Sequence, residues 1–217
     1  MRAKVFNIGF PKTGTMSLGR ALRLLGYDLC PHIPAGELKR QYGLPVPVTQ
    51  EGLAATCLPI AEKYDAFRNI PWTLLYKEMD QAFPGSKFIL TRREPKGWFK
   101  SVEKHFGSKT SALTDFVYGK DKPPVGNEAL YIERFEQHNA AVMDYFKGRP
   151  DALLALDLEL ADWGPLCSFL GRRRPLLRGY PHRNRADLRA NRAGKFEKLY
   201  TYHVQEWLKP LRRSKKS

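Results

Sequence analysis

A short loop near the amino terminus combines residue types that bind phosphate. It follows the apolar run Val5 to Gly9, which reads as a buried strand, and it precedes an apolar pattern with helical spacing. In such a strand–loop–helix unit, backbone N–H groups and the helix N-terminus converge on one spot, which suits an anionic oxygen. Lys12 adds a cation that can approach the oxygen joining a leaving phosphate to a transferred group. The predicted binding residues, which supply backbone and hydroxyl donors, are Pro11, Lys12, Thr13, Gly14, Thr15, Met16 and Ser17.

The same loop argues against ATP chemistry. A Walker A loop reads GxxxxGK[ST], and Gly9 and Gly14 have its separation. However, Thr15 stands where the lysine should be, and Lys12 lies inside the loop. This pattern disfavours a P-loop-type kinase, which remains the alternative enzyme.

A second strand–loop–helix unit offers a separate anion site. Lys87 to Arg92 is the clearest strand pattern in the chain, and a helix is predicted from Pro95 to about Phe106. Arg93 lies between them and precedes Ser101 by eight residues. An arginine can make bidentate, charge-assisted hydrogen bonds to a terminal phosphate, and a serine two turns into the helix can add a hydroxyl. Arg93 and Ser101 are therefore predicted to bind a second phosphate.

Together these units resemble the sulfotransferases that use 3′-phosphoadenosine 5′-phosphosulfate (PAPS). Residues 11–15, Pro-Lys-Thr-Gly-Thr, are similar to the family's 5′-phosphosulfate loop, PKxGT[TS]. Met16 departs from the commonest next residue, and Ser17 would take over its hydroxyl role. The resemblance covers most of residues 4–184. Other similar stretches are Tyr64 to Trp72, Leu75 to Glu78, Phe83 to Thr91 and Tyr180 to Asn184.

The resemblance also assigns the second loop. The family's 3′-phosphate motif places an arginine eight residues before a helical serine, a spacing that Arg93 satisfies and Arg92 fits less well. The family's cytosolic steroid and phenol enzymes end in a glycine-rich RKGxxG segment, which this chain lacks; His182 and Arg183 would help close over the cosubstrate instead. The resemblance implies transfer of the sulfuryl group from PAPS to a hydroxyl or amine of a small-molecule or glycan acceptor. Adenosine 3′,5′-bisphosphate would be the product, and no metal is required.

The general base has two candidates. Lys12 is expected to neutralise charge on the leaving phosphate, while a base takes the acceptor's proton. His32 follows the predicted second strand, and its ordinary pKa suits general-base catalysis near neutrality. Asp65 lies in the short third strand, where acidic residues serve the nearest relatives. Asn69 complicates that interpretation because many relatives have aspartate there and an amide cannot accept a proton. The two candidates stand equal on the sequence.

Alternating strand and helix patterns predict the fold that positions these residues. The pattern indicates a three-layer α/β/α domain with a central, mostly parallel sheet of about five strands, similar to P-loop nucleotide kinases. Ligands of such sheets bind at the carboxyl ends of the strands. Residues 31–50 and 107–126 are expected to form the loops that choose the acceptor. The predicted strands are 5–9, 27–30, 64–68, 87–92 and 152–156.

Length and charge define the domain organisation. The 217 residues, 42% of them hydrophobic, fit one domain over residues 1–183 and a basic helical extension over 184–217 packed on it. The net charge is +15, and residues 172–217 hold fifteen Lys or Arg against three acids. A non-enzymatic binder of acidic polymers or nucleic acid is therefore the alternative from another class. Within the sulfotransferase interpretation no stable nucleic-acid partner is expected.

The cysteines indicate the compartment. Cys30, Cys57 and Cys167 are odd in number and have no metal-ligand or redox spacing, which favours a reducing environment. No stretch approaches the roughly 20 apolar residues of a transmembrane helix, and the amino terminus does not read as a signal peptide. A cytoplasmic location is expected, and the sequence indicates no particular oligomeric state.

Overall fold

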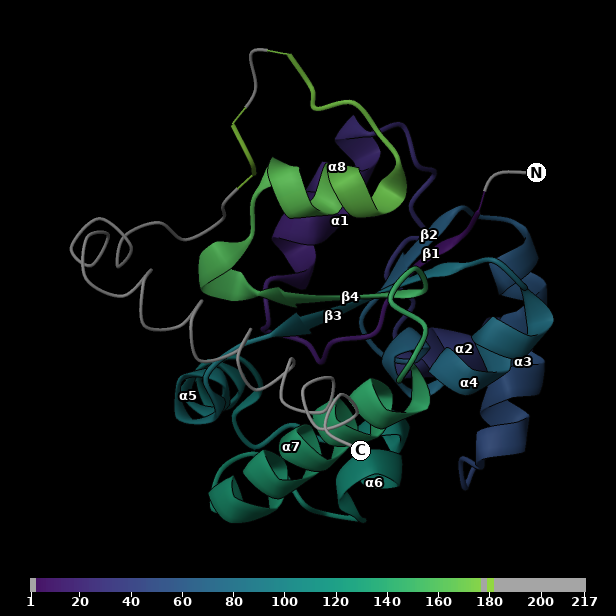
Figure 1. Ribbon diagram of the computed structural model, residues 1–217. Coiled ribbons are helices and arrows are strands. Elements are labelled where there is room, and N and C mark those ends of the chain that lie inside the picture. Colours follow the sequence, from purple (N-terminus) through teal and green to yellow (C-terminus); the bar gives the residue numbers. More distant parts are fainter. Residues whose placement is uncertain (1–2, 177–178, 182–217) are drawn as a thin grey trace, which may run out of the picture. The chain divides into compact units, whose positions relative to one another are not determined.

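The computed structural model describes residues 3–176 and 179–181, which belong to one compact unit that ends at Pro181 (Figure 1). The predicted extension 184–217 lies outside the described residues, as do His182 and Arg183.

A parallel sheet forms the centre of this unit, and its strand order is β2-β1-β3-β4. All three strand pairs are parallel, which confirms the predicted sheet type. The order places β1 and β3 side by side, so the loops that follow these two strands emerge next to each other. The strands are β1 (Val5–Asn7), β2 (Ala66–Arg68), β3 (Lys87–Arg92) and β4 (Leu153–Asp157).

The predicted strand over residues 27–30 is the one that does not form as expected. It is reduced to a single parallel bridge between Leu29 and Ala66, so the sheet has four strands rather than five among the described residues. Cys30 still donates its N–H to the carbonyl of Ala66 at 2.9 Å. Pro31 comes next and has no N–H, so it cannot donate to a continuing ladder.

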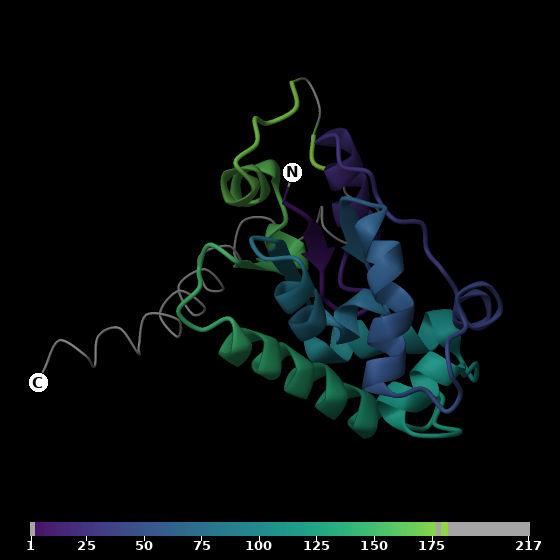
Figure 2. The same ribbon diagram turned by 90° about the vertical axis from the view of Figure 1, so that its right-hand side faces the viewer.

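Helices cover both faces of the sheet, which confirms the predicted three-layer architecture (Figures 1 and 2). The helices α1 (Thr15–Leu24) and α8 (Trp163–Leu170) pack on one face, where their apolar side chains meet Val5 of β1 and Ile89 of β3. The opposite face carries α2 (Ala35–Tyr42), α3 (Gln50–Glu62), α4 (Tyr76–Ala82), α5 (Pro95–Phe106), α6 (Ala112–Tyr118) and α7 (Glu128–Tyr145).

Two of these helices lie in segments that the sequence predicted as loops. Helix α2 occupies part of residues 31–50, and α6 occupies part of residues 107–126. Ser111 caps α6 by accepting a hydrogen bond from the N–H of Thr114, whose hydroxyl in turn accepts one from the N–H of Ser111. This reciprocal cap uses threonine in place of the usual Glu or Gln, so the sequence signature is weak.

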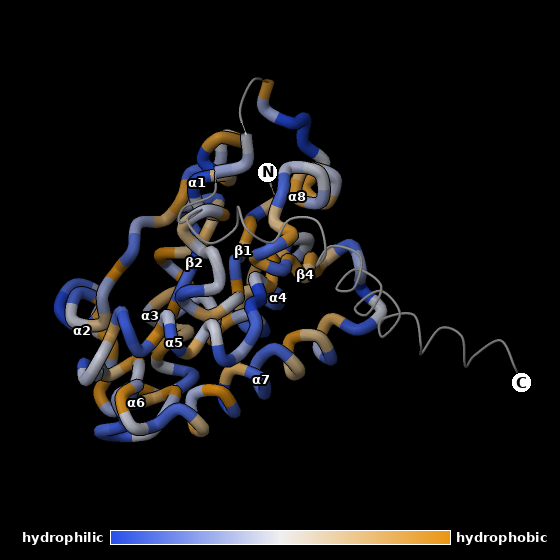
Figure 3. The backbone as a smooth tube through the Cα atoms, turned by 90° about the vertical axis from the view of Figure 1, so that its left-hand side faces the viewer, coloured by the Kyte–Doolittle hydropathy of each residue, from blue (hydrophilic) through white to orange (hydrophobic). Residues whose placement is uncertain are grey.

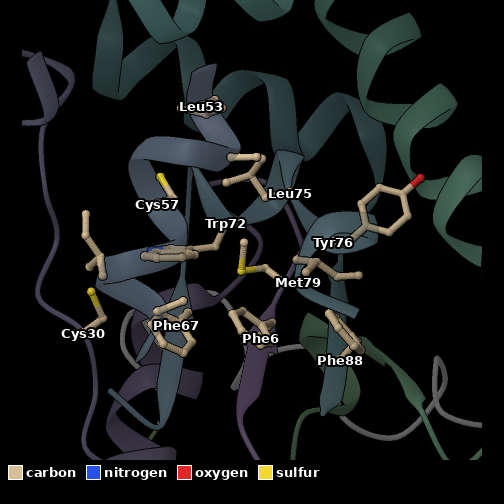
Figure 4. Close-up of a cluster of buried hydrophobic side chains, with 14 of the residues drawn as sticks. Phe6, Cys30, Leu53, Cys57, Phe67, Trp72, Leu75, Tyr76, Met79 and Phe88 are labelled. Atoms are coloured by element: carbon tan, nitrogen blue, oxygen red, sulfur yellow. The ribbon is translucent and has the colours of Figure 1, made fainter. Parts of the chain in front are cut away.

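An aromatic cluster holds three neighbouring strands, β2, β1 and β3, in register (Figure 4). Phe6 of β1 stacks on Phe67 of β2 with ring centroids 4.6 Å apart, and on Phe88 of β3 at 5.4 Å. Trp72 lies in the 3₁₀ turn η1 (Trp72–Leu74) and packs on Phe67 at 4.4 Å. All four side chains are buried, and each buried ring stabilises the fold by roughly 1.5–3 kcal/mol. The loops that follow β1, β2 and β3 therefore start from fixed positions.

Helix α7 is the longest described helix and alternates apolar and polar residues along its length (Figure 3). Its buried residues, Tyr131, Phe135 and Val142, recur with helical spacing and face the core. Among the described helices, none combines the length and the apolar character that crossing a bilayer requires.

Candidate active site

The loops after β1 and β3 meet at the carboxyl edge of the sheet. The chain leaves β1 toward β2 on one side, whereas β3 lies on the other side, so the strand order reverses between β1 and β3. Open α/β sheets bind their ligands at such a reversal, because the neighbouring loops diverge there. Both of the predicted phosphate-binding units lie at this point.

The first of these units, the phosphate loop (residues 9–17), has an unusual backbone. Lys12 and Gly14 have positive φ angles, 75° and 97°, which are left-handed conformations. A left-handed lysine costs on the order of 1 kcal/mol, and residues of this kind cluster at ligand sites. Within the described residues, no group accepts a hydrogen bond from the N–H of Lys12, Thr13 or Gly14. These N–H groups and the start of α1, which has no side-chain cap and no acidic residue in its first turn, are arranged to receive an anion.

A buried network of hydrogen bonds fixes the start of the phosphate loop to the core of the protein. The Thr13 hydroxyl donates to the carbonyl of Phe10 at 2.7 Å and lies 2.6 Å from the hydroxyl of Thr91 on β3. The side-chain oxygen of Asn7 accepts hydrogen bonds from Thr91 and from the N–H of Gly9, both at 3.1 Å. The hydroxyl of Thr13 therefore serves the loop itself, and its backbone N–H, which no described group accepts, is left to bind a ligand.

Three side chains from separate elements bind carbonyl groups of the same loop region. His138 of α7 contacts the carbonyl oxygen of Ile8 through Nε2 at 2.8 Å, and Thr73 of η1 donates to that of Gly9 at 3.0 Å. Trp98 of α5 donates its indole N–H to the carbonyl of Pro11 at 2.9 Å. Nothing in the spacing of the sequence marked His138 or Trp98 as part of this loop, so the structure alone supplies these contacts.

The histidine in this set is neutral at physiological pH. Burial lowers the pKa of His138 to about 4, and the hydrogen bond to Ile8 opposes that shift only in part. A carbonyl oxygen can only accept, so the proton of the neutral ring resides on Nε2. His138 thus positions the backbone just before the phosphate loop.

The loop after β3 distinguishes its two arginines. Arg92 forms a bidentate ion pair with Asp157 of β4, to which it donates from Nε to Oδ1 at 2.9 Å and from Nη2 to Oδ2 at 3.1 Å. Arg93 has no hydrogen bond or ion pair with any described residue, and its guanidinium lies over Gly97 in the first turn of α5. Ser101 is half-buried and follows Gly97 by one helical turn, so it lies on the same side of α5. Arg93 and Ser101 can therefore act on one ligand, whereas Arg92 is occupied.

The N-terminus of α5 is already capped by a carboxylate. Glu94 accepts hydrogen bonds from the N–H groups of Lys96 at 2.9 Å and Gly97 at 2.6 Å, and these bonds lower the pKa of Glu94. An anion at this loop would consequently depend on the Arg93 guanidinium rather than on the helix N–H groups. The hydrogen bond from Trp98 to Pro11 ties α5 to the phosphate loop, so the two units are held together.

The two candidate bases lie at opposite edges of the sheet. His32 follows the Leu29 bridge at the carboxyl edge, and partial desolvation, followed by the nearby Arg68 cation, lowers its pKa. Asp65 precedes β2 at the amino edge, where its carbonyl accepts from the N–H of Val5 and its carboxylate accepts from the N–H of Asp28 at 3.3 Å. Of the two candidates, only His32 lies at the carboxyl edge, where the phosphate loop also begins.

Sequence reasoning did not assign two residues that end β2 at the carboxyl edge. Arg68 extends toward the start of α1, where its Nη1 lies 2.8 Å from the thioether of Met16. Asn69 has a φ of 67°, and its side-chain oxygen is buried without a hydrogen-bond partner among the described residues. Their positions directly after a strand of a parallel sheet could have marked both as site residues.

A comparison with known families identifies the class of the chain. A family model described as "Sulfotransferase domain" matches residues 4–123 and 107–188. The chain belongs to this sulfotransferase family. The matched residues include the phosphate loop, Arg93 and Ser101, and the predicted resemblance is confirmed.

The sulfotransferase also has a counterpart among solved structures. The crystal structure of a sulfotransferase from Alicyclobacillus acidocaldarius is 19% identical in sequence and superposes with a TM-score of 0.51. The match covers 94% of this chain and 92% of that one, and at this identity it shows a shared fold. No curated protein matches the chain.

The remaining predicted ligand-binding residues of the sulfotransferase differ in their exposure. Met16 is exposed at the start of α1, whereas Thr15 and Ser17 are buried there. His182 and Arg183 lie outside the described residues. Within residues 3–176 and 179–181, no group of three or more His, Cys, Asp or Glu side chains is arranged to hold a metal ion.

Proposed function

We propose that this sulfotransferase binds PAPS across the loops after β1 and β3 and transfers its sulfuryl group to an acceptor hydroxyl or amine. The observation that carries the proposal is the pairing of two anion-binding units on neighbouring strands. The unpaired N–H groups of the phosphate loop, with Lys12, suit the 5′-phosphosulfate, and Arg93 with Ser101 suits the 3′-phosphate. A nucleotide that carries phosphates at both ends fits this arrangement better than ATP does.

Lys12 would provide the main electrostatic assistance. During transfer, the sulfur forms a bond to the acceptor oxygen or nitrogen while its bond to the bridging oxygen of the phosphate breaks. Negative charge develops on that bridging oxygen, and the Lys12 ammonium stabilises it more strongly in the transition state than in the bound substrate. Lys12 has no ion pair or hydrogen bond within the described residues, so its charge is available. Its replacement by methionine should cost roughly 3 kcal/mol, about a hundredfold in kcat.

His32 would accept the proton that the acceptor loses. The lowered pKa keeps the imidazole neutral at pH 7, which a general base requires. Its position at the carboxyl edge, close to Arg68, is on the side of the sheet where the phosphate loop lies.

The acceptor would be a small molecule or a glycan chosen by the segments that flank the nucleotide. Residues 31–50, which contain α2, and residues 107–126, which contain α6, provide these segments. Variable segments on a fixed sheet commonly decide the specificity of such enzymes.

Thermal unfolding with adenosine 3′,5′-bisphosphate tests the proposal directly. At a hundred times Kd, a ligand that binds only the folded state contributes about 2.7 kcal/mol, which corresponds to roughly 5–10 °C in a protein of this size. Lys12→Ala and Arg93→Ala should abolish the shift. Lys63→Ala, which removes an exposed lysine at the amino edge of the sheet, should preserve it. Stabilisation by magnesium ATP with no response to the bisphosphate would overturn the proposal in favour of a kinase.

A further inference from the structure

Arg68 is a cation at the carboxyl edge that neither phosphate-binding motif includes. It is the last residue of β2 and pairs in register with Asn7 of β1, two residues before the phosphate loop begins. Side chains alternate along a strand, so Arg68 shares the face of Ala66, which packs in the same cluster as α1. Figure 3 shows α1 close to β2, in agreement with the packing between them.

The path of the side chain leads toward the phosphate loop. A Cβ atom at Gly19 of α1 would lie 2.8 Å from Cδ and 2.9 Å from Nε of Arg68, so only glycine leaves room for the arginine in this position. Farther along the side chain, Nη1 lies 2.8 Å from the sulfur of Met16, one turn nearer to the start of α1. The guanidinium therefore points along α1 toward its N-terminus, where the anion site lies.

The charge of Arg68 is not compensated by any described residue. Its Nε is buried without a hydrogen-bond partner, and no described carboxylate forms an ion pair with it. The thioether of Met16 is only a weak acceptor. Desolvation, followed by repulsion from Arg23, lowers the pKa of Arg68. A half-buried cation without a partner is costly to the fold, and an anionic ligand would relieve that cost.

We propose that Arg68 binds a tetrahedral oxyanion beside the phosphate loop, in addition to the two phosphates of the nucleotide. The planar guanidinium presents parallel N–H donors that match two oxygens of such a group. Two sources share this chemistry: the sulfuryl group of the donor, and a sulfate, phosphate or similar group on an acidic acceptor. The inference rests on the proposed function for the position of the nucleotide.

Titration with inorganic sulfate at constant ionic strength tests the inference, with binding followed by isothermal calorimetry. The titration is made on the protein alone, with saturating bisphosphate and with saturating PAPS. Bisphosphate fills both phosphate sites, so sulfate that binds to this complex reports on the place beside Arg68. Arg68→Met should weaken this sulfate binding about tenfold or more, as expected for loss of a charge-assisted hydrogen bond.

The PAPS titration identifies the source of the oxyanion. If Arg68 binds the sulfuryl group, PAPS occupies the place and sulfate no longer binds there. If Arg68 binds an anionic acceptor, sulfate still binds to the PAPS complex and still depends on Arg68. Both results support the inference and name its ligand.

Two further variants test whether sulfate binding depends on the position of the Arg68 guanidinium or only on the positive charge of this region. Arg20→Met removes an exposed arginine of α1 and should leave the sulfate affinity of the bisphosphate complex within twofold of wild type. Gly19→Ala keeps the charge of Arg68 but displaces its side chain, so it should also weaken sulfate. Arg68→Met should not lower the unfolding temperature of the ligand-free protein, because it removes an uncompensated cation.

Failure of the inference is distinguishable from failure of the proposed function. Equal sulfate affinity of wild type, Arg68→Met and Arg20→Met in the bisphosphate complex would overturn the role of Arg68 and leave PAPS binding intact. A protein that ignores the bisphosphate would overturn the proposed function instead. In that case the sulfate titration of the ligand-free protein tests the role of Arg68. Sulfate affinity that is unchanged in Arg68→Met refutes the inference, and weaker affinity supports it.

Discussion

Acidification should lower the free energy of unfolding because His138 is buried, and the size of this loss is set by how far burial lowers its pKa. Burial lowers the pKa of His138 to about 4 in the folded protein, from 6.5 in the unfolded chain. Above pH 6.5 the ring is neutral in both states, so its protonation costs no stability. As the pH falls from 6.5 toward 4, the unfolded chain binds a proton that the folded protein refuses, and stability is lost. The shift corresponds to about 3 kcal/mol in all, of which about 2 kcal/mol falls between pH 7 and pH 5.

His138→Gln isolates this contribution, because a glutamine N–H can still donate to the carbonyl of Ile8 but does not titrate in this range. The free energy of unfolding would be measured for both proteins by urea titration at pH 7, 6 and 5. The advantage of the wild type over His138→Gln should shrink by about 2 kcal/mol between pH 7 and pH 5, while all other titrating groups cancel in the comparison. A difference that stays constant across this range would refute the assignment of a buried, neutral His138.

Three other outcomes are expected from the site. Trp98→Phe removes the hydrogen bond to the carbonyl of Pro11 and should cost about 1 kcal/mol of stability; calorimetry should show weaker bisphosphate binding, and unchanged affinity would contradict the link between the two loops. Gly9→Ala should destabilise the protein severely because a Cβ there collides with β3, whereas a Cβ at Gly164 meets open space and Gly164→Ala should be neutral or slightly stabilising. Denaturant titrations that show equal effects of the two substitutions would disprove the close approach of Gly9 to β3. His32→Asn should lower kcat and remove the acid limb of the pH–rate profile, which in the wild type should lie below 6.5, the ordinary pKa of histidine. An unaltered profile would exclude His32 as the base.

The strands could be predicted best where the whole segment is buried. Phe6 and Phe88 lie in short, largely apolar runs, and such runs are characteristic of strands covered on both faces. The segment around Leu29 carries a similar run but forms one bridge only, because the proline after Cys30 has no N–H with which to extend the ladder. Helices α2 and α6 escaped prediction since helices this short owe their stability to tertiary packing rather than to their own pattern.

The site could be predicted in outline from spacing. Arg93 was preferred to Arg92 on spacing alone, and the structure adds a physical reason, since Asp157 occupies Arg92. Asp65 was expected within the third strand and instead directly precedes β2 at the amino edge, because residue type alone does not specify which edge of the sheet a side chain occupies. Arg68 lacked any motif, and only its unpaired, half-buried guanidinium marks it.

The sequence by itself determined the phosphate loop, the four strands of the sheet and the resemblance to sulfotransferases, because these depend on local spacing. Which groups hold that loop in place was decided by the tertiary structure: His138, Thr73 and Trp98 come from three distant segments and bind neighbouring carbonyl groups. The same holds for the positions of His32 and Asp65, which lie at opposite edges of the sheet. Hydrogen bonds and electrostatic fields act through space, so residue type and spacing along the chain do not specify them.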